Sequence, residues 1–426
     1  MKGKKYIIKG GQVWNRKGFE RKNLLVVNGI LTEESPELSP DGSDPTEEIN
    51  AEGLYVLPGL VDMHVHFREP GFSYKETIKT GSEAAEAGGF TTVCTMPNLH
   101  PAPDSLESLK MQLDIIDRDA VIKVIPFATI TRNRLGNELV DYAALAPYVA
   151  GFSDDGSGVQ DEKVMREAMK GIAKTGKILA AHCEVDSLLD GGYIHKGKYA
   201  SVRGHRGICS ESEWKEVERD IRLAEETGCR LHVCHVSTKE SVELIREAKK
   251  RGVKVTCETG PHYLTFSDAD LQEEGRFKMN PPIRDIEDRE ALRQGVIDGT
   301  IDVIATDHAP HSEGEKSRGL EKSAMGVVGL ETAFGAVYTT MVATGLMSLE
   351  RMVECMSVSP ARILGLDEQG QIEKRKPAML TIVDLDKKWE VNPKEFKTMG
   401  RATPYSEMTL QGKVVATIFG EDVLRN

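Results

Sequence analysis

Five short stretches of this chain place histidine or aspartate where a buried β-strand would end. The first, VDMHVHFREPG at residues 61–71, sets His64 and His66 two positions apart in an apolar run, with Arg68 two positions further on. Side chains alternate between the two faces of a strand, so these three would share one face. A single histidine there is commonly a hydrogen-bonded core residue, whereas two together are compatible either with core packing or with half of a metal site.

The other four stretches are FSDDG, AHCE, HVCHVS and ATDHAPH, at residues 152–156, 181–184, 232–237 and 305–311. They add His182, Asp307 and one of Asp154 and Asp155, since only one of two adjacent side chains can point inward. A buried carboxylate needs a cation or strong hydrogen-bond donors beside it. Asp307, at the end of the apolar run IDVIATD, therefore predicts such partners.

The two histidines of LHVCHVS differ in what they predict. His232 and His235 are three residues apart, so a strand would turn them to opposite faces. His235 lies nearer the strand end and is the expected ligand. We expect His232 to pack or form hydrogen bonds outside the strand layer.

Taken together, these imidazoles and carboxylates predict a metal site. Mixed ligands of this kind suit Zn²⁺, with Mn²⁺ or Co²⁺ as substitutes. The number of ligands indicates two divalent ions, or one ion beside a vacant position. Such a site predicts hydrolysis of a carbonyl or phosphoryl compound.

The elements that must position these residues lie in the middle of the chain, where short β-branched runs alternate with amphipathic stretches. The eight strand candidates begin near residues 59, 90, 121, 149, 177, 229, 253 and 301. Alternation predicts a parallel α/β fold, and eight strands predict a TIM-like (β/α)8 barrel with its chemistry at the C-terminal strand ends. The chain has no G-x-G-x-x-G after the first strand and no G-x-x-x-x-G-K-[ST], which argues against a nucleotide-binding open sheet.

The two ends of the chain differ from the middle. Residues 1–57 and 370–426 contain strand-like runs separated by turn residues, without a long helix candidate. They predict one small β-sandwich domain built from both termini, beside a catalytic domain at residues 58–369. Within that catalytic domain, Ser210 and Glu213 have the spacing of a capping box for the helix that follows.

Composition excludes some classes of partner. The chain of 426 residues has a formal charge of −12, which argues against nucleic acid and an anionic membrane surface. Its seven cysteines form no C-x-x-C pair, and no apolar run is long enough to span a membrane. We expect a cytoplasmic protein that acts on a small molecule.

The chain resembles the bacterial class I dihydroorotases of the amidohydrolase superfamily. The resemblance rests, in chain order, on HVHFREPG, MPN, FSDDG, AHCE, HVCHVSTKES, KMNPP and ATDHAPH, and it spans residues 53–385. It implies a zinc enzyme with one or two ions per subunit. The implied ligands are His64, His66 and Asp307 for the more buried ion, His182 and His235 for the second, and Asp155 between them. Many relatives carry a carboxylated lysine at that bridging position.

The same resemblance implies the substrate contacts. Arg68, Asn98 and His311 would bind an α-carboxylate, for which a guanidinium fork is suited, and Asn280 would contact other polar atoms of the ring. Asp307 would be the general acid–base. The implied reaction is the reversible closure of N-carbamoyl-L-aspartate to L-dihydroorotate, the third step of de novo pyrimidine synthesis. The implied assemblies are a homodimer and a complex with aspartate transcarbamoylase.

One segment departs from the family pattern. This chain has Ala324-Met325-Gly326 where the class often has Pro-Phe-Gly. Met325 and Gly326 would contact substrate largely through the backbone. Since proline restricts the residue before it, we expect a change in loop stiffness without loss of activity. The polar stretch 311–326 is expected to act as an active-site lid.

Two alternative functions stay open. The nearer is another cyclic-amide hydrolase, a hydantoinase or allantoinase, although such relatives usually carry the bridging lysine and lack the arginine of HFREPG. The other is a non-catalytic dihydroorotase-like scaffold, although such chains typically lose metal ligands. Assays with dihydroorotate, hydantoin and allantoin discriminate the first alternative, and zinc analysis of the purified protein discriminates the second.

Overall fold

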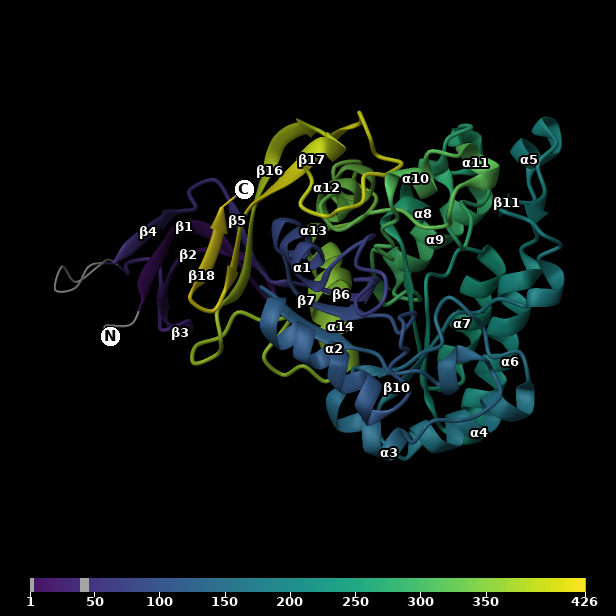
Figure 1. Ribbon diagram of the computed structural model, residues 1–426. Coiled ribbons are helices and arrows are strands. Elements are labelled where there is room, and N and C mark those ends of the chain that lie inside the picture. Colours follow the sequence, from purple (N-terminus) through teal and green to yellow (C-terminus); the bar gives the residue numbers. More distant parts are fainter. Residues whose placement is uncertain (1–3, 39–45, 426) are drawn as a thin grey trace.

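Parallel strands and helices alternate along the middle of the chain (Figure 1). The computed structural model describes residues 4–38 and 46–425. Each of the eight stretches in which a strand was expected contains one. These strands are β6 (Leu60–Val65), β7 (Phe90–Thr95), β8 (Lys123–Pro126), β9 (Gly151–Phe152), β10 (Ile178–Ala181), β13 (Arg230–Val233), β14 (Val255–Thr259) and β15 (Val303–Ile304).

The eight strands pair in parallel within two sheets. One sheet has the order β6-β7-β8 and the other β15-β14-β13-β10-β9. Isolated parallel bridges link the sheets at both margins, between Ala128 and Phe152 and between Val65 and His308. The expected α/β architecture with parallel strands is confirmed. Because neighbouring strands run in the same direction, their carboxyl ends lie on one side.

Helices follow most of these strands and cover them. The longer helices are α1 (Ile78–Ala87), α2 (Leu106–Asp119), α4 (Glu162–Ala173), α6 (Glu211–Thr227), α7 (Lys239–Lys250) and α9 (Ile286–Asp298). Thr77, Asp161 and Thr238 accept hydrogen bonds from the first turns of α1, α4 and α7 and so fix where these helices begin. The buried residues of α4 recur every three or four positions, as one apolar face requires.

Shorter helices lie in the connections. They are α3 (Tyr142–Leu145), α5 (Lys198–Arg203), α8 (Pro261–Thr265), α10 (Glu313–Lys316), α11 (Gly319–Lys322), α12 (Ala333–Val337), α13 (Leu349–Val353) and α14 (Ser359–Leu364). The connection from β10 to β13 also holds a small parallel pair, β11 (Ile194–His195) and β12 (Gly207–Ile208). No helix within residues 4–38 and 46–425 combines the length and apolar character needed to cross a bilayer.

The expected capping box at the start of α6 does not form. Ser210 makes no side-chain cap hydrogen bond. The Glu213 carboxylate instead accepts hydrogen bonds from the backbone N–H groups of Ser237 and Thr238, which follow β13. A buried carboxylate is better satisfied by this cluster of donors than by one helix-terminal N–H.

Strands from both ends of the chain form a separate sheet. They are β1 (Lys5–Asn15), β2 (Gly18–Val27), β3 (Ile30–Ser35), β4 (Glu47–Asn50), β5 (Tyr55–Pro58), β16 (Met379–Glu390), β17 (Thr409–Phe419) and β18 (Asp422–Arg425). The purple and yellow strands of Figure 1 lie side by side, in the order β18-β17-β16-β5-β1-β2-β3, with β4 also paired to β1.

The β-sandwich stays a prediction, but the strands form one continuous hydrogen-bonded sheet. The reason lies in β1, which pairs with β2 on one side and with both β4 and β5 on the other. Its register shifts between Ile8 and Gly11, where Gly10 has a φ of 74°, a conformation that favours glycine. Side chains from distant strands, including Leu24 and Ile418, share one core.

Candidate active site

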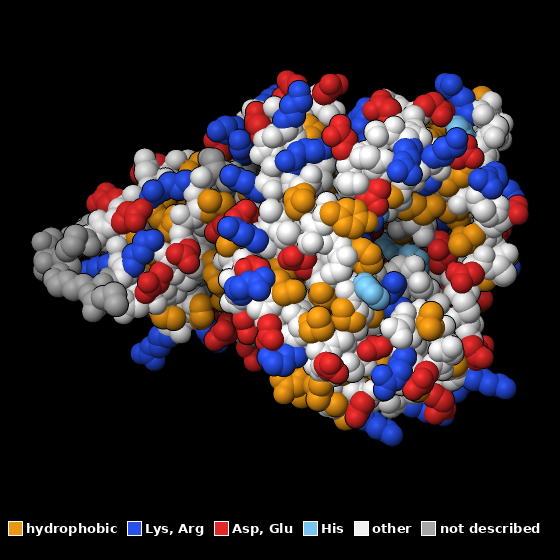
Figure 2. Space-filling view, viewed as in Figure 1, with side chains coloured by type: hydrophobic (Ala, Val, Ile, Leu, Met, Phe, Trp, Pro, Cys, Tyr) orange, Lys and Arg blue, Asp and Glu red, His pale blue; other side chains and the backbone are white. Residues whose placement is uncertain are grey.

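A cavity of about 340 Å³ lies beyond the carboxyl ends of the parallel strands. Figure 2 shows histidine side chains at a hollow of this face. The residues that were predicted for the site and line the cavity are His66, Arg68, Asn98, Asp155, His182, His235, Asn280, Asp307, His311, Met325 and Gly326. His64 is the exception, because it lies beneath the lining with no exposed surface.

The ligand candidates lie at or just after strand ends. His64 is the penultimate residue of β6, and His66 follows the strand directly. Arg68, His235 and Asp307 have φ values of 52°, 32° and 47°, so the backbone reverses its normal twist at the ends of three strands. Left-handed backbone at such residues costs about 1–3 kcal/mol and is concentrated at functional sites. These turns bring the side chains toward one cavity.

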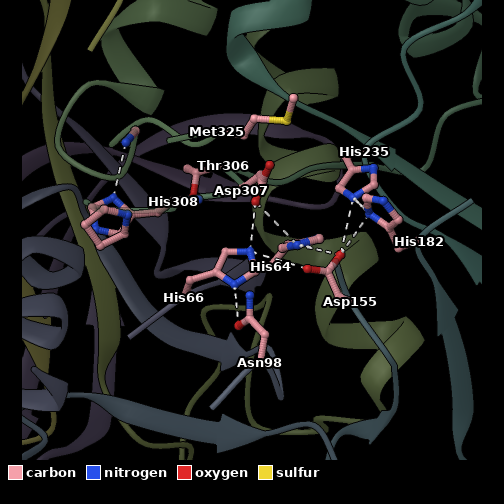
Figure 3. A network of polar contacts seen from close by, with 12 residues as sticks. His64, His66, Asn98, Asp155, His182, His235, Thr306, Asp307, His308 and Met325 are labelled. Atoms are coloured by element: carbon pink, nitrogen blue, oxygen red, sulfur yellow. Dashed lines mark hydrogen bonds and ion pairs between the residues drawn. The ribbon is translucent and has the colours of Figure 1, made fainter. Parts of the chain in front are cut away.

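Asp155 lies among the four predicted histidine ligands (Figure 3). Its Oδ1 is 3.3 Å from His235 Nε2 and 3.4 Å from His182 Nδ1. The same oxygen is 3.4 Å from His64 Nε2, and Oδ2 is 3.5 Å from His66 Nε2. A carboxylate in this position can share one oxygen or both between two ions.

Asp307 closes the other side of the cluster. Its Oδ1 is 3.0 Å from His66 Nε2 and 3.5 Å from His64 Nε2. His64 Nε2 is buried and has no hydrogen-bond partner, although two carboxylates lie near it. A buried nitrogen without a partner, beside carboxylates, is the arrangement that a bound cation satisfies. The two sets His64–His66–Asp307 and His64–Asp155–His235 each bring their ligand atoms within 4.8 Å of one another.

Glu258 on β14 sets the orientation of His64. Its Oε1 is 2.6 Å from His64 Nδ1 and its Oε2 is 3.1 Å from His232 Nε2. An ionised carboxylate only accepts hydrogen bonds, so a metal-bound His64 would keep its proton on Nδ1 and present Nε2 to the metal position. Asn98 Oδ1 acts in the same way on His66 Nδ1, at 2.8 Å.

The prediction that His232 lies outside the strand layer is wrong. It shares the Glu258 carboxylate with His64 and is therefore on the inner side. The alternation rule fails because β13 ends at Val233 and the backbone turns at His235. His232 and His235 can then both lie on the inner side of the strands. Glu258 itself was not anticipated, although a single carboxylate inside the run VTCETG was a signal of a buried partner.

The structure decides between the adjacent aspartates of FSDDG. Asp154 accepts hydrogen bonds from the backbone N–H groups of Ile130 and Thr131, at 2.8 and 3.1 Å, and from the Thr131 hydroxyl. It therefore anchors the loop after β8. Asp155 faces the histidines.

The buried charges of the cluster shift one another's pKa. Burial alone would lower the pKa of His64, but the carboxylates of Asp155, Glu258 and Asp307 raise it well above the usual value. Burial would raise the pKa of Asp155, but His64, His182 and His235 hold it well below the usual range. Excess negative charge in this pocket therefore favours a cation.

The mouth of the cavity carries cationic and amide groups. Arg68 is buried, and Arg68 Nε donates to the carbonyl of Pro310 at 3.2 Å. Burial lowers the pKa of Arg68 to about 10, although Asp307 and Asp155 oppose that shift. Arg68 remains charged at neutral pH, so a carboxylate that enters the cavity meets a guanidinium.

Both ring nitrogens of His311 form hydrogen bonds within the protein. Its Nε2 donates to the Met325 carbonyl at 2.7 Å, and Lys75 Nζ donates to its Nδ1 at 3.3 Å. A substrate carboxylate must therefore displace the Met325 carbonyl to receive a hydrogen bond from this ring. That contact couples the predicted anion-binding histidine to the segment expected to be a lid.

The segment 311–326 is more structured than an irregular lid. It contains α10 and α11, and Lys316 Nζ is buried against the carbonyls of Lys278 and Ala324 at 3.0 and 2.8 Å. Gly326 has a φ of 133°, and a Cβ at this position would lie 2.6 Å from the Ala309 carbonyl oxygen. Only glycine fits there, so Gly326 fixes the close approach of this segment to the loop after β15.

Besides Glu258, two more residues at the site were missed by the sequence analysis. Arg134 lines the cavity and donates from Nη1 to the Asp155 carbonyl at 2.9 Å. Glu184, two residues after His182, contacts the side chain of Asn280. Arg134 lies in a polar loop without an apolar run, so its sequence offered no signal. Glu184 belonged to the motif AHCE and could have been weighed with His182.

Comparisons with known proteins identify a matching family model and similar chains. The "Dihydro-orotase-like" family model matches residues 53–241. The chain is 47% identical to "Dihydroorotase" of Fusobacterium nucleatum over 415 residues, covering 97% of this chain and 96% of that protein. It is 44% identical to "Dihydroorotase" of Bacillus pumilus over 415 residues, with the same two coverages.

A solved structure with a similar fold is that of L-hydantoinase from Arthrobacter aurescens. It superimposes with a TM-score of 0.87 at 27% identity and covers 99% of this chain and 96% of its own. A crystal structure of D-hydantoinase has a TM-score of 0.86 at 21% identity, which indicates a shared fold.

Proposed function

Because the chain belongs to the dihydroorotase family, we propose that it catalyses the reversible closure of N-carbamoyl-L-aspartate to L-dihydroorotate in pyrimidine biosynthesis. One observation carries the proposal. The buried guanidinium of Arg68 opens into the same cavity as the histidine and aspartate cluster. A ring amide can then meet the cluster while its carboxylate is bound beside it.

The donor set fits a divalent ion, and we assign zinc, with one or two ions per subunit. The buried, unpartnered Nε2 of His64 supports this fit. The proposed ligands are His64, His66 and Asp307 for one ion, His182 and His235 for a second, and Asp155 between them. A divalent ion bound there would activate a water near neutral pH and polarise the amide carbonyl.

We propose that Arg68 and Asn98 bind the substrate α-carboxylate. The guanidinium offers two parallel donors to a planar carboxylate. Because Asn98 Oδ1 is occupied by His66, the amide group left for the substrate is its NH₂ donor. His311 joins them when it releases the Met325 carbonyl. Met325 and Gly326 line the cavity beside it, where they contact the ring.

We assign Asp307 as the general acid–base. Burial would raise its pKa, but His64 and His66 lower it, so the carboxylate is ready to accept a proton at neutral pH. In hydrolysis, water oxygen bonds to the ring amide carbon and Asp307 takes a water proton. Asp307 then delivers that proton to the ring nitrogen as the C–N bond breaks. Ring closure follows the same path in reverse.

We propose that the two parallel sheets form a closed (β/α)8 barrel at residues 58–369. The bridges at both margins of the sheets support closure, as does the likeness to the hydantoinase structures. We also propose that residues 1–57 and 370–426 form one small domain, since their strands share a sheet.

We propose a cytoplasmic enzyme that acts on a small molecule. The seven cysteines are free thiols, which supports a reducing compartment. A homodimer and a complex with aspartate transcarbamoylase are proposed assemblies. Light scattering of the purified protein, alone and with the transcarbamoylase, tests both. A mass equal to one chain for the protein alone would exclude the homodimer, and two unchanged separate masses in the mixture would exclude the complex.

The test of the activity is a side-by-side assay with dihydroorotate, hydantoin and allantoin. We expect turnover of dihydroorotate alone. Turnover of another ring without dihydroorotate would assign a different cyclic-amide hydrolase. A protein that binds no zinc and stays inactive with zinc added would be a non-catalytic scaffold.

A further inference from the structure

Glu184 links two loops at the cavity. It lies in the loop after β10, two residues beyond His182. Both of its carboxylate oxygens are 3.0 Å from Nδ2 of Asn280. The backbone of this segment is held in place, because Gln160 Nε2 donates to the Glu184 carbonyl at 2.8 Å and Gln160 Oε1 accepts from Asp186 N–H at 3.0 Å. The carboxylate is therefore a fixed acceptor facing the Asn280 amide.

This contact determines the orientation of the Asn280 side chain. The oxygen and nitrogen of an asparagine amide are hard to distinguish by position alone, and the hydrogen-bond partners decide between them. An ionised carboxylate offers only acceptors, so the NH₂ group must face Glu184 and Oδ1 must face away from it. In the structure Asn280 Oδ1 is buried and has no hydrogen-bond partner.

A buried carbonyl oxygen without a donor costs free energy, so this atom needs a partner that arrives with a ligand. Asn280 lines the cavity. We propose that Glu184 is a positioning residue that holds Asn280 so that its Oδ1 accepts a hydrogen bond from an N–H of the substrate. The inference rests on the proposed function, in which both substrates carry such groups, on the ring ureide and on the carbamoyl chain.

The arrangement predicts that Asn280 acts as a hydrogen-bond acceptor toward the substrate. With Glu184 in place, Asn280 is complementary to an N–H edge and not to a carbonyl. Glu184 also lies near a proposed metal ligand, with its Oε2 3.5 Å from His182 Nε2. That distance is longer than the two contacts with Asn280. Support of a metal ligand would show as lost zinc, whereas positioning of Asn280 would show as weaker substrate binding.

Exchanging carboxylate and amide side chains at positions 184 and 280 distinguishes support of His182 from positioning of Asn280. Glu184→Gln allows the Gln NH₂ group to face Asn280, which then turns its own NH₂ toward the substrate. Asn280→Asp places two carboxylates against each other. In the double variant Glu184→Gln/Asn280→Asp, the Gln NH₂ donates to the new carboxylate, whose other oxygen again faces the substrate as an acceptor. All three variants are nearly isosteric with the wild type.

The measurements are KM and kcat with dihydroorotate and with N-carbamoyl-aspartate, zinc content, and melting temperature. Each single variant should raise KM about three- to tenfold, the equivalent of one hydrogen bond. The double variant should return KM to within about twofold of wild type, with zinc content unchanged throughout. Glu218→Gln, at an exposed position of α6, is the matched control and should leave all values unchanged.

Two results would overturn the inference while the wild type remains active. One is a double variant whose KM rises by the product of the two single effects, because Glu184 would then not act through Asn280. The other is loss of zinc in Glu184→Gln, which would assign Glu184 to His182. A wild type that turns over neither substrate would instead refute the proposed function, and the inference with it.

Discussion

Glu258→Gln should weaken zinc binding although Glu258 is not a proposed ligand. The wild-type carboxylate has one oxygen for His64 Nδ1, at 2.6 Å, and one for His232 Nε2, at 3.1 Å. Glutamine keeps a single acceptor, so one of the two histidines must face an NH₂ group. Where that histidine is His64, its proton moves to Nε2 and the lone pair for the metal is lost.

The size of the effect follows from this competition. Loss of a carboxylate that orients a metal-bound histidine typically weakens metal affinity about 10- to 100-fold, or roughly 1.4–2.7 kcal/mol. Asn98 still orients His66, and Asp307 and Asp155 keep their positions. The site should therefore bind zinc less tightly but not lose it altogether at high zinc concentration.

The assay is a titration of metal-free protein with zinc in competition with a chromophoric chelator. Glu213→Gln is the matched control, because Glu213 is also a buried carboxylate, but its hydrogen bonds go to Ser237, Thr238 and Ser241. It should lower stability and leave zinc affinity unchanged. A Glu258→Gln protein with wild-type zinc affinity would refute the inference that Glu258 orients His64 Nε2 toward the metal.

Three further changes test other parts of the site. Arg68→Ala should raise KM about 10- to 100-fold, since it removes a charge-assisted bidentate contact, and loss of zinc in this variant would contradict its substrate role. Gly326→Ala should lower the melting temperature and raise KM, because the new Cβ would lie 2.6 Å from the Ala309 carbonyl oxygen. Gly314→Ala, in the same segment, has open space around its new Cβ and should change neither value. Burial and the nearby Lys278 lower the pKa of Lys316 to about 7. The unfolded chain thus binds more protons than the folded one between about pH 7 and 10. In this range the unfolding free energy of wild type, relative to that of Lys316→Met, should rise by up to about 1.4 kcal/mol per pH unit. Denaturant titrations of both proteins at several pH values measure this difference. A flat or falling difference would contradict the lowered pKa of Lys316.

The sequence predicted the site best where regular strand geometry holds. His64 on β6 and His66 directly after it alternate as predicted, and both point into the cluster. Residues beyond the strand ends were harder, because alternation stops where φ becomes positive. His232 was placed on the wrong side because it was compared with His235, which lies beyond the end of β13 at a positive φ. Asp154 and Asp155 follow the two-residue strand β9 and could not be separated before their hydrogen-bond partners were known.

Features that depend on packing between distant segments could not be read from the sequence. The continuous terminal sheet depends on a bend at Gly10, which brings β4 and β5 to the same edge of β1. The contact between Glu184 and Asn280 joins loops 96 residues apart. The hold of His311 on the Met325 carbonyl depends on how the segment 311–326 folds back. No local periodicity encodes such contacts.

We expect this cavity to interconvert a ring amide and its open-chain acid. The most direct measurement starts one reaction from dihydroorotate and another from N-carbamoyl-aspartate, with zinc-loaded protein. Both mixtures should converge on the same ratio, and protein stripped of zinc should leave both unchanged. Mixtures that stay as prepared with zinc-loaded protein would contradict the account.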